Sequence, residues 1–292
     1  LTFLIGRFYW GKLPWLRPLW LAWCLLIGAS VLTTYQHHFI DIPTALLAGA
    51  FILWALPWQA ASPLRAHEPA SPRRRRCALL YLALAILLAL PARGGGVRLW
   101  LLWPAVSCLI AAAGYARLGA AIWQKQADGR PALAARLLLA PLRFAARINQ
   151  YIWLRGNARR TAALTARLHL GSILAADRYR AVVDVCAECS PRRRPACYHS
   201  EAMTDMAAPA PAALNRAAAA IERFLNTQAE PVLICCALGY GRSVAVALVW
   251  LLRYGGQTDI DSALRHIRRV RPLARLSAET RAAVAQAQAL RD

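Results

Sequence analysis

The sequence predicts a membrane α-helical first half followed by an α/β domain with a central sheet flanked by helices. Hydrophobic residues make up 58% of the 292 residues, and the first half contains apolar runs without a charged residue. Roughly 20 apolar residues cross a bilayer as a helix. From about Leu168 onward, short apolar runs alternate with helical patterns, which is typical of an α/β domain.

About four transmembrane helices are expected, at residues 19–35, 42–58, 77–91 and 99–116. Residues 1–10 look like the tail of an earlier membrane helix, so the sequence looks like a fragment without its true N-terminus. If all four helices cross, three clusters of basic residues fall on one side: residues 7–17, residues 65–76, and those from 117 onward. The positive-inside rule makes that side the cytoplasm. The sequence therefore predicts a multi-pass protein of the cell membrane with a cytoplasmic C-terminal domain.

The formal net charge of +22 is scattered through loops and linkers. The sequence has no zinc-finger pattern and no interleaving of aromatic and basic residues of the kind that stacks on bases. Nucleic acid is therefore not expected as a partner. Basic flanks of membrane helices that contact anionic lipid explain this charge better.

A short loop between the first two expected helices contains His37 and Asp41. An Asp four residues after a His can orient an imidazole as nucleophile or base, although an ordinary interfacial loop has the same composition. This stretch resembles the last motif of the type 2 phosphatidic acid phosphatases, in which His37 would attack phosphate and Asp41 would orient it. The other two motifs of that family are missing. Residues 1–60 would thus be a remnant with an incomplete second site, and residues 61–117 an additional pair of membrane helices.

Residues 118–163 form a basic linker in which apolar residues and arginines recur at helical spacing. Pro141 is expected to break or kink this helix. An amphipathic segment on the cytoplasmic membrane surface is one interpretation, and a helix packed on the soluble domain is the other.

Residues 164–292 are expected to form the α/β domain. The expected strands are 168–171, 181–185, 198–202 and 231–234, and the expected helices are 212–225, 244–252, one ending at 270 and one beginning after Ser277. Ser243 is expected to cap the helix that follows the last strand, and Thr258 with Asp261 resembles a capping box.

The most informative stretch is 231–250, PVLICCALGYGRSVAVALVW. A buried strand leads into a tight loop containing two glycines, and a helix follows at once. Loop amides and the first turn of a helix together form an anion site. Cys236 stands at the mouth of this loop, where the helix N-terminus and Arg242 both favour a thiolate. A thiolate beneath a bound phosphate suggests phosphoryl transfer to sulfur followed by hydrolysis.

The spacing of Cys236, Arg242 and Ser243 resembles the signature of the cysteine-dependent tyrosine and dual-specificity phosphatases. By that resemblance Cys236 is the nucleophile, Arg242 binds phosphate and stabilises the transition state, and Ser243 hydrogen-bonds the departing thiolate. The main chain of the loop would bind phosphate through Ala237, Leu238, Gly239, Tyr240 and Gly241. The family usually has His before the nucleophile, where this sequence has Cys235.

Phosphoryl transfer also needs an acid to protonate the departing oxygen. In dual-specificity phosphatases it is an Asp on a loop about 30 residues before the nucleophile, and Asp205 matches that position. A turn or helix-capping Asp is the alternative interpretation, and Glu201 is the nearest rival acid. Asp184 is expected to be structural.

No metal or other cofactor is expected. Cys186 and Cys189, with Cys197 and His199 beyond them, lack the second clean pair of a structural zinc site, so free thiols are the better interpretation. A reduced nucleophile also favours a reducing compartment.

These features predict a membrane-anchored phosphoric monoester hydrolase that works through a cysteinyl-phosphate intermediate. Its expected partners are membrane lipids and a phosphorylated protein or small phosphomonoester, with a lipid phosphate as a further possibility. Two alternatives stay open. One is a catalytically weak membrane scaffold that binds phosphorylated partners, and the other is a phospholipid phosphatase.

Overall fold

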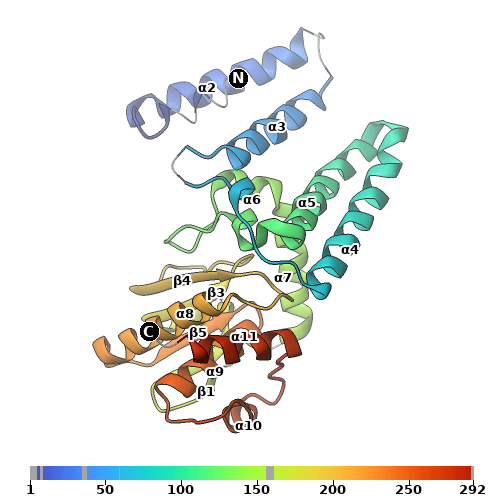
Figure 1. Ribbon diagram of the computed structural model, residues 1–292. Coiled ribbons are helices and arrows are strands. Elements are labelled where there is room, and N and C mark those ends of the chain that lie inside the picture. Colours follow the sequence, from blue (N-terminus) through green and yellow to red (C-terminus); the bar gives the residue numbers. More distant parts are fainter. Residues whose placement is uncertain (1–4, 7–8, 35–37, 59, 156–160, 291–292) are drawn as a thin grey trace.

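The computed structural model describes residues 5–6, 9–34, 38–58, 60–155 and 161–290 (Figure 1). The first half of the chain is helical and the second half contains the sheet. The two parts meet where the ends of the helices reach one edge of the sheet.

The first half contains four long apolar helices: α2 (Arg17–Thr33), α3 (Asp41–Ala55), α4 (Pro72–Ala89) and α5 (Leu102–Ala113). By length and composition, three helical stretches among the described residues can cross a bilayer: Pro14–Thr33, Pro72–Gly94 and Gly96–Trp123. α3 has 15 residues and is shorter than a bilayer requires. Of the four expected membrane helices, α2, α4 and α5 thus lie in stretches long enough to span a bilayer, and α3 does not.

α4 and α5 form a hairpin whose base lies against the sheet and whose tip points away from it (Figure 1). A π-helical turn, Gly114–Leu118, ends α5 and leaves main-chain carbonyls without helical partners. The Arg74 guanidinium donates to two of them, the carbonyls of Gly114 (3.0 Å) and Tyr115 (3.1 Å), and also binds Glu68. One arginine of the basic cluster in the first turns of α4 therefore has a structural role at the base of the hairpin.

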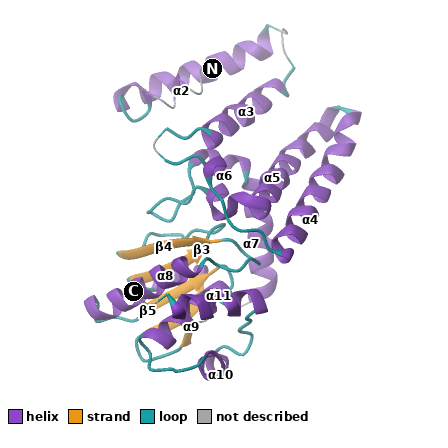
Figure 2. Ribbon diagram, in the orientation of Figure 1, coloured by secondary structure: helices purple, strands orange, loops and turns teal. Residues whose placement is uncertain are grey.

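The second half contains a five-stranded sheet in the order β1-β2-β5-β3-β4 (Figure 2). Its strands are β1 (Ala162–Ala163), β2 (Leu168–Ser172), β3 (Ala181–Cys186), β4 (Cys197–Met203) and β5 (Val232–Cys236). β1 pairs antiparallel with β2, and the other pairings are parallel. The predicted α/β domain with a central sheet is confirmed, and each expected strand is present with its boundaries shifted by one or two residues.

Side chains that alternate along the strands fill two layers. One layer packs against α8 (Pro211–Thr227), α9 (Arg242–Arg253) and α11 (Ala278–Ala289). The other packs against a 3₁₀ helix, Ile173–Arg178, and includes Val182 and Leu233. Both central strands, β3 and β5, are buried along their whole length, which explains why Asp184 of β3 is their one charged residue and the rest are apolar.

Two of the expected helix caps are wrong. α9 begins at Arg242 without a side-chain cap, so Ser243 lies inside the helix and its hydroxyl points elsewhere. α10 (Ile260–Val270) is capped by Asp259, whose carboxylate accepts the Ser262 N–H at 2.8 Å, and not by Thr258. Ser277 caps α11 as expected.

The basic linker folds into α6 (Leu133–Leu138) and α7 (Ala140–Leu154). Pro141 lies in the first turn of α7, where its missing N–H costs nothing, so it starts a helix and does not kink one. One face of α7 buries Gln150 and Leu154 against the sheet domain, as in the second interpretation of this segment.

A buried ion pair ties this linker to the sheet. Lys125 Nζ lies 2.6 Å from Asp184 Oδ2 and donates to the carbonyls of Cys186 and Cys189. Burial alone would lower the pKa of Lys125, but the Asp184 carboxylate outweighs it and the pKa is raised. The Tyr198 hydroxyl and the Cys186 N–H complete the bonds of Asp184, which is structural as expected.

Replacement of Lys125 by Met should lower the free energy of unfolding of the full chain by about 3–5 kcal/mol, because it leaves the Asp184 carboxylate buried without its cation. Thermal unfolding in a neutral detergent measures this. The double variant Lys125→Met/Asp184→Asn should recover at least half of the loss. Strictly additive effects of the two substitutions would contradict the pairing.

Candidate active site

The candidate site lies where the carboxyl ends of three parallel strands meet. β5 ends at Cys236, β3 at Cys186 and β4 at Met203. Residues 237–241 connect β5 to the N-terminus of α9. Parallel strands bring their carboxyl ends to one edge of a sheet, and a helix N-terminus there adds main-chain donors.

Four carbonyls of the loop point outward, because each accepts a hydrogen bond from a group outside the loop. The pairs are Ala237 O with Gln150 Nε2 (3.1 Å), Leu238 O with Arg271 Nη2 (2.9 Å), Gly239 O with Arg271 Nε (3.2 Å), and Tyr240 O with the Arg275 N–H (2.8 Å).

A trans peptide holds its C=O and its N–H on opposite sides. The four outward carbonyls therefore turn the N–H groups of residues 238–241 inward. One of these is seen directly, since the Gly239 N–H donates to Cys236 Sγ at 3.2 Å. The loop is built as an anion cradle around the sulfur atom.

Gly239 is required in this loop for two reasons. Its φ of +80° lies in the left-handed region, and a Cβ there would lie 2.5 Å from the carbonyl oxygen of Gly171. β2 and the loop thus approach each other as closely as a glycine allows.

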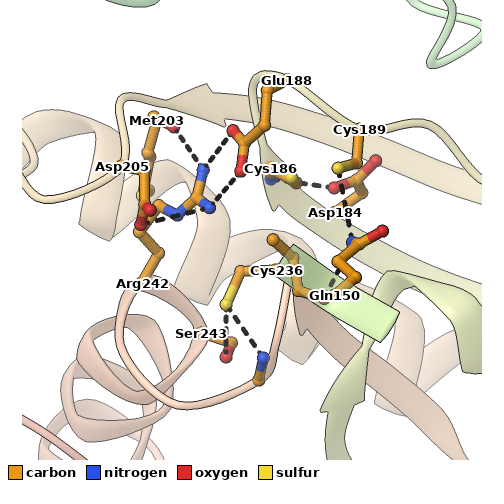
Figure 3. Close-up of polar contacts among 12 residues, drawn as sticks. Gln150, Asp184, Cys186, Glu188, Cys189, Met203, Asp205, Cys236, Arg242 and Ser243 are labelled. Carbon is orange, nitrogen blue, oxygen red and sulfur yellow. Dashed lines mark hydrogen bonds and ion pairs between the residues drawn. The ribbon is translucent and has the colours of Figure 1, made fainter. Parts of the chain in front are cut away.

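Cys236 and Ser243 lie side by side (Figure 3). Cys236 Sγ is 3.3 Å from Ser243 Oγ, and both residues are buried. The hydroxyl that does not cap α9 is thereby available to the sulfur atom. Sγ thus has two polar neighbours, this hydroxyl and the Gly239 N–H.

Arg242 is held at the edge of the loop by hydrogen bonds from both of its terminal nitrogens. Nη1 and Nη2 contact the two carboxylate oxygens of Glu188 at 2.7 and 2.5 Å, and Nη1 also donates to Met203 O at 2.9 Å. Burial disfavours the charge, but Glu188 outweighs it and raises the pKa of Arg242. Nε is buried and has no partner among the described residues, so one edge of the guanidinium is left for a ligand.

Glu188 was not expected from the sequence. Burial alone would raise the pKa of this carboxyl, but Arg242 outweighs it and the pKa is lowered. Its position directly after a buried parallel strand is the one signal that points to it, because such positions face the site. Arg271 and Gln150 carried no local signal. Arg271 also lies over the Tyr240 ring, with Cζ 4.4 Å from the ring centroid.

Asp205 lies in the loop after β4, close to the arginine. Its Oδ1 is 3.3 Å from Arg242 Nη2, and its side chain is 57% exposed, so it can reach a ligand. Its carbonyl accepts the Tyr115 hydroxyl of the π-helical turn at 3.0 Å. Met206 follows with φ of +55°, a strained conformation of the kind found near functional sites. The rival acid Glu201 instead binds Arg216 at 2.7 Å.

A cavity of about 360 Å³ joins these residues. Its floor contains Cys236, Arg242 and Asp205, and its wall comes from the helical half of the chain. The wall residues are Tyr81, Ala111, Tyr115, Ile122, Trp123 and Leu142. The structure thus brings Cys236, Arg242 and Asp205 together in a pocket that two parts of the chain share, with Ser243 behind the sulfur atom of Cys236.

Among the described residues, one group has the composition of a metal site. The ligand atoms of Cys186, Glu188 and Cys189 lie within 4.8 Å of one another. Glu188 already pairs with Arg242, and burial raises the pKa of the Cys186 thiol, so this group is occupied by protein contacts. Burial also raises the pKa of Cys235, which points away from the loop into the second layer of the sheet.

The second predicted site is described only in part. His37 lies outside the described residues. Asp41 begins α3, and its Oδ2 accepts the His38 N–H at 3.1 Å. α3 lies apart from the sheet and its loop (Figure 1).

Comparison with known proteins found no matching family model and no matching curated protein. Solved structures do match part of the chain. Human DUSP28 is 20% identical with a TM-score of 0.38, covering 44% of this chain and 93% of its own. The active form of Tk-PTP is 23% identical with a TM-score of 0.39, covering 44% and 97%. A mouse dual specificity phosphatase complexed with zinc tungstate is 21% identical with a TM-score of 0.40, covering 45% and 87%.

Replacement of Arg271 by Leu should lower kcat/KM for a soluble aryl phosphate by about 100-fold, because two loop carbonyls lose the donors that turn their amides inward. Steady-state kinetics of the full chain in detergent measure this. Arg275→Leu is the matched control, since Arg275 holds the loop through its main-chain N–H, and its rate should stay within about twofold. Equal losses in both variants would contradict this role of Arg271.

Proposed function

We propose that the protein is a membrane-anchored phosphatase that hydrolyses phosphate monoesters through a cysteinyl-phosphate intermediate. The observation that carries this proposal is the loop around Cys236. Its sulfur atom lies at the centre of a cradle whose four carbonyls are all tied outward, next to an arginine with a free edge.

The geometry supports a two-step reaction. The Cys236 thiolate attacks phosphorus, so an S–P bond forms while the ester P–O bond breaks, and protonated Asp205 gives its proton to the departing oxygen. Water then attacks phosphorus, the S–P bond breaks, and the Asp205 carboxylate takes a proton from the water. Inward amides and Arg242 Nε stabilise the charge on the phosphoryl oxygens, and Ser243 donates to the thiolate as it leaves.

A scaffold that only binds phosphorylated partners is the alternative, and activity separates the two. The full chain in detergent should hydrolyse p-nitrophenyl phosphate. Cys236→Ser should reduce this to background because the nucleophile is lost, and Asp205→Asn should reduce kcat by about 100-fold because the leaving oxygen is no longer protonated.

Glu201→Gln is the control for Asp205→Asn. It removes the rival carboxylate on β4, which is bound to Arg216 outside the cavity, and kcat should stay within about twofold. A wild-type chain that binds tungstate but releases no p-nitrophenol would favour the scaffold.

Several features support a membrane anchor with the active site on the cytoplasmic side. Three helical stretches have the length and composition of membrane spans, and basic residues collect at the base of the α4–α5 hairpin, next to the sheet. In this proposal the chain has four parts. A membrane region like part of a type 2 phosphatidic acid phosphatase covers residues 1–60, and an additional helix pair covers residues 61–117. The basic linker covers residues 118–163, and the catalytic domain covers residues 164–292. The site of His37 and Asp41 stays a prediction within it.

A lipid phosphate is a second candidate substrate beside a phosphorylated protein. The wall of the cavity favours it, because Ala111, Ile122 and Trp123 belong to a candidate membrane span and present apolar surface beside the phosphate cradle. An acyl chain can lie against such a wall while its phosphate reaches Cys236.

Ala145 tests this candidate, since it lines the cavity on an exposed turn of α7. Ala145→Asn should lower kcat/KM for dihexanoyl phosphatidic acid by about tenfold and leave that for p-nitrophenyl phosphate within about twofold, because a polar group is placed beside the acyl chains. Ala145→Leu is the control and should keep the lipid rate. A phosphotyrosine peptide hydrolysed faster than the lipid by the wild-type chain would contradict it.

A further inference from the structure

A second cavity lies beside the active site. Its volume is about 900 Å³. The two cavities lie on opposite sides of Gln150 and Glu188, which line both of them. It is bounded by α6, α7, the start of the 3₁₀ helix after β2 and the segment that follows β3. The proposed chemistry at Cys236 makes no use of it.

The lining of this cavity is strongly basic. It contains six arginines: Arg130, Arg136, Arg143, Arg147, Arg155 and Arg192. Glu188 is the one acidic residue in the described lining, and both of its oxygens already bind Arg242. Within the described part of the chain, none of the six guanidinium groups forms an ion pair.

This crowding of like charge has a cost in the unliganded protein. Arg143 is half-buried, and burial together with Arg147 and Arg136 lowers its pKa. A base whose pKa is lower in the folded state than in the unfolded state destabilises the fold wherever it is charged, which includes neutral pH. An anion bound among the arginines would remove this cost.

A hydroxyl group adds an independent observation. Ser190 lines the same cavity, and its Oγ is buried without a hydrogen-bond partner among the described residues. Buried polar atoms normally have a partner. A hydroxyl donor next to several planar guanidinium groups is the donor set that suits phosphate oxygens.

α7 also indicates where the phosphate comes from. Beside the stripe of Arg143 and Arg147, it exposes Phe144 (64%), Ile148 (44%) and Ile152 (49%) one turn apart. A helix with an arginine stripe next to an exposed apolar stripe suits the boundary between lipid headgroups and acyl chains. Basic pockets near the cytoplasmic ends of membrane helices bind anionic headgroups.

We propose that the arginine cavity is a second phosphate-binding site, separate from the loop of Cys236, and that it takes the phosphodiester headgroup of an anionic phospholipid. We treat such a lipid as a ligand and not as a substrate, because Cys236 and Asp205, the nucleophile and the acid of the proposed reaction, line the other cavity. Bound there, it would hold α7, and with it Gln150, against the catalytic loop.

Calorimetric titration of the full chain in a neutral detergent tests this proposal. Dihexanoyl phosphatidylglycerol should bind, and dihexanoyl phosphatidylcholine, whose headgroup is neutral overall, should not. Arg143→Gln/Arg147→Gln should weaken binding of phosphatidylglycerol by at least about tenfold, since each basic residue contributes about fivefold at a membrane surface. Arg193→Gln/Arg194→Gln removes the same charge from exposed positions outside the cavity and should change binding by less than about twofold.

Inorganic phosphate, titrated into wild type and into Arg143→Gln/Arg147→Gln so that the binding common to both can be subtracted, distinguishes a lipid headgroup from a free phosphate ion as the source of phosphate. Weaker binding of the free ion than of phosphatidylglycerol supports a lipid headgroup as the ligand of this cavity. Equal or tighter binding of the free ion would overturn that assignment.

Thermal unfolding shows whether the variants fold and adds a second readout. Without lipid, Arg143→Gln should raise the unfolding midpoint, because it relieves repulsion. With saturating phosphatidylglycerol the order should reverse, and wild type should be the more stable. Equal weakening by both pairs of substitutions, or no reversal, would overturn the proposal, because the arginines would then act only as diffuse surface charge.

Discussion

The site depends on one constraint, which is that the main-chain carbonyls between Cys236 and Arg242 accept hydrogen bonds from donors outside the loop. A short loop between a strand and a helix has no reason of its own to turn its amides to one side. Arg271, Gln150 and the Arg275 N–H supply that reason from outside the loop. A positively charged group that binds a carbonyl also strengthens the dipole of that peptide, so the two contacts of Arg271, with Leu238 O and Gly239 O, also make the following amides better donors to an anion.

This arrangement explains why the helical half of the chain is part of the site and not merely attached to it. Gln150 comes from the linker, Tyr115 holds the backbone of Asp205, and Lys125 is buried at the end of β3. Three contacts from one half of the chain thus meet the loop of the nucleophile, the loop of the acid and the strand that leads to Glu188. A shift of the helical half of the chain relative to the sheet would alter all three contacts at once.

The residues that could be predicted from the sequence are those whose signal is local. Cys236, Arg242 and Ser243 lie within eight positions on one strand–loop–helix unit, where spacing alone fixes their approach. The strands were predictable for a similar reason, since β5 is apolar throughout and β3 is apolar except for Asp184. The predicted caps failed where the helix begins one or two residues away from the expected position, as α9 does at Arg242 and α10 does after Asp259.

The residues that support the nucleophile could not be found in this way. Glu188, Arg271 and Gln150 lie 54, 33 and 87 positions from the groups that they bind in or beside the loop, and the intervening chain gives no measure of that approach. Each has a common appearance in sequence, as an acid in a loop, an arginine in a basic run and an amide on a helix. Their roles follow from the fold, because the parallel strands bring their carboxyl ends, and the loops that follow them, to one edge of the sheet. The side chains that reach this edge then determine which way the peptide groups around the sulfur atom face.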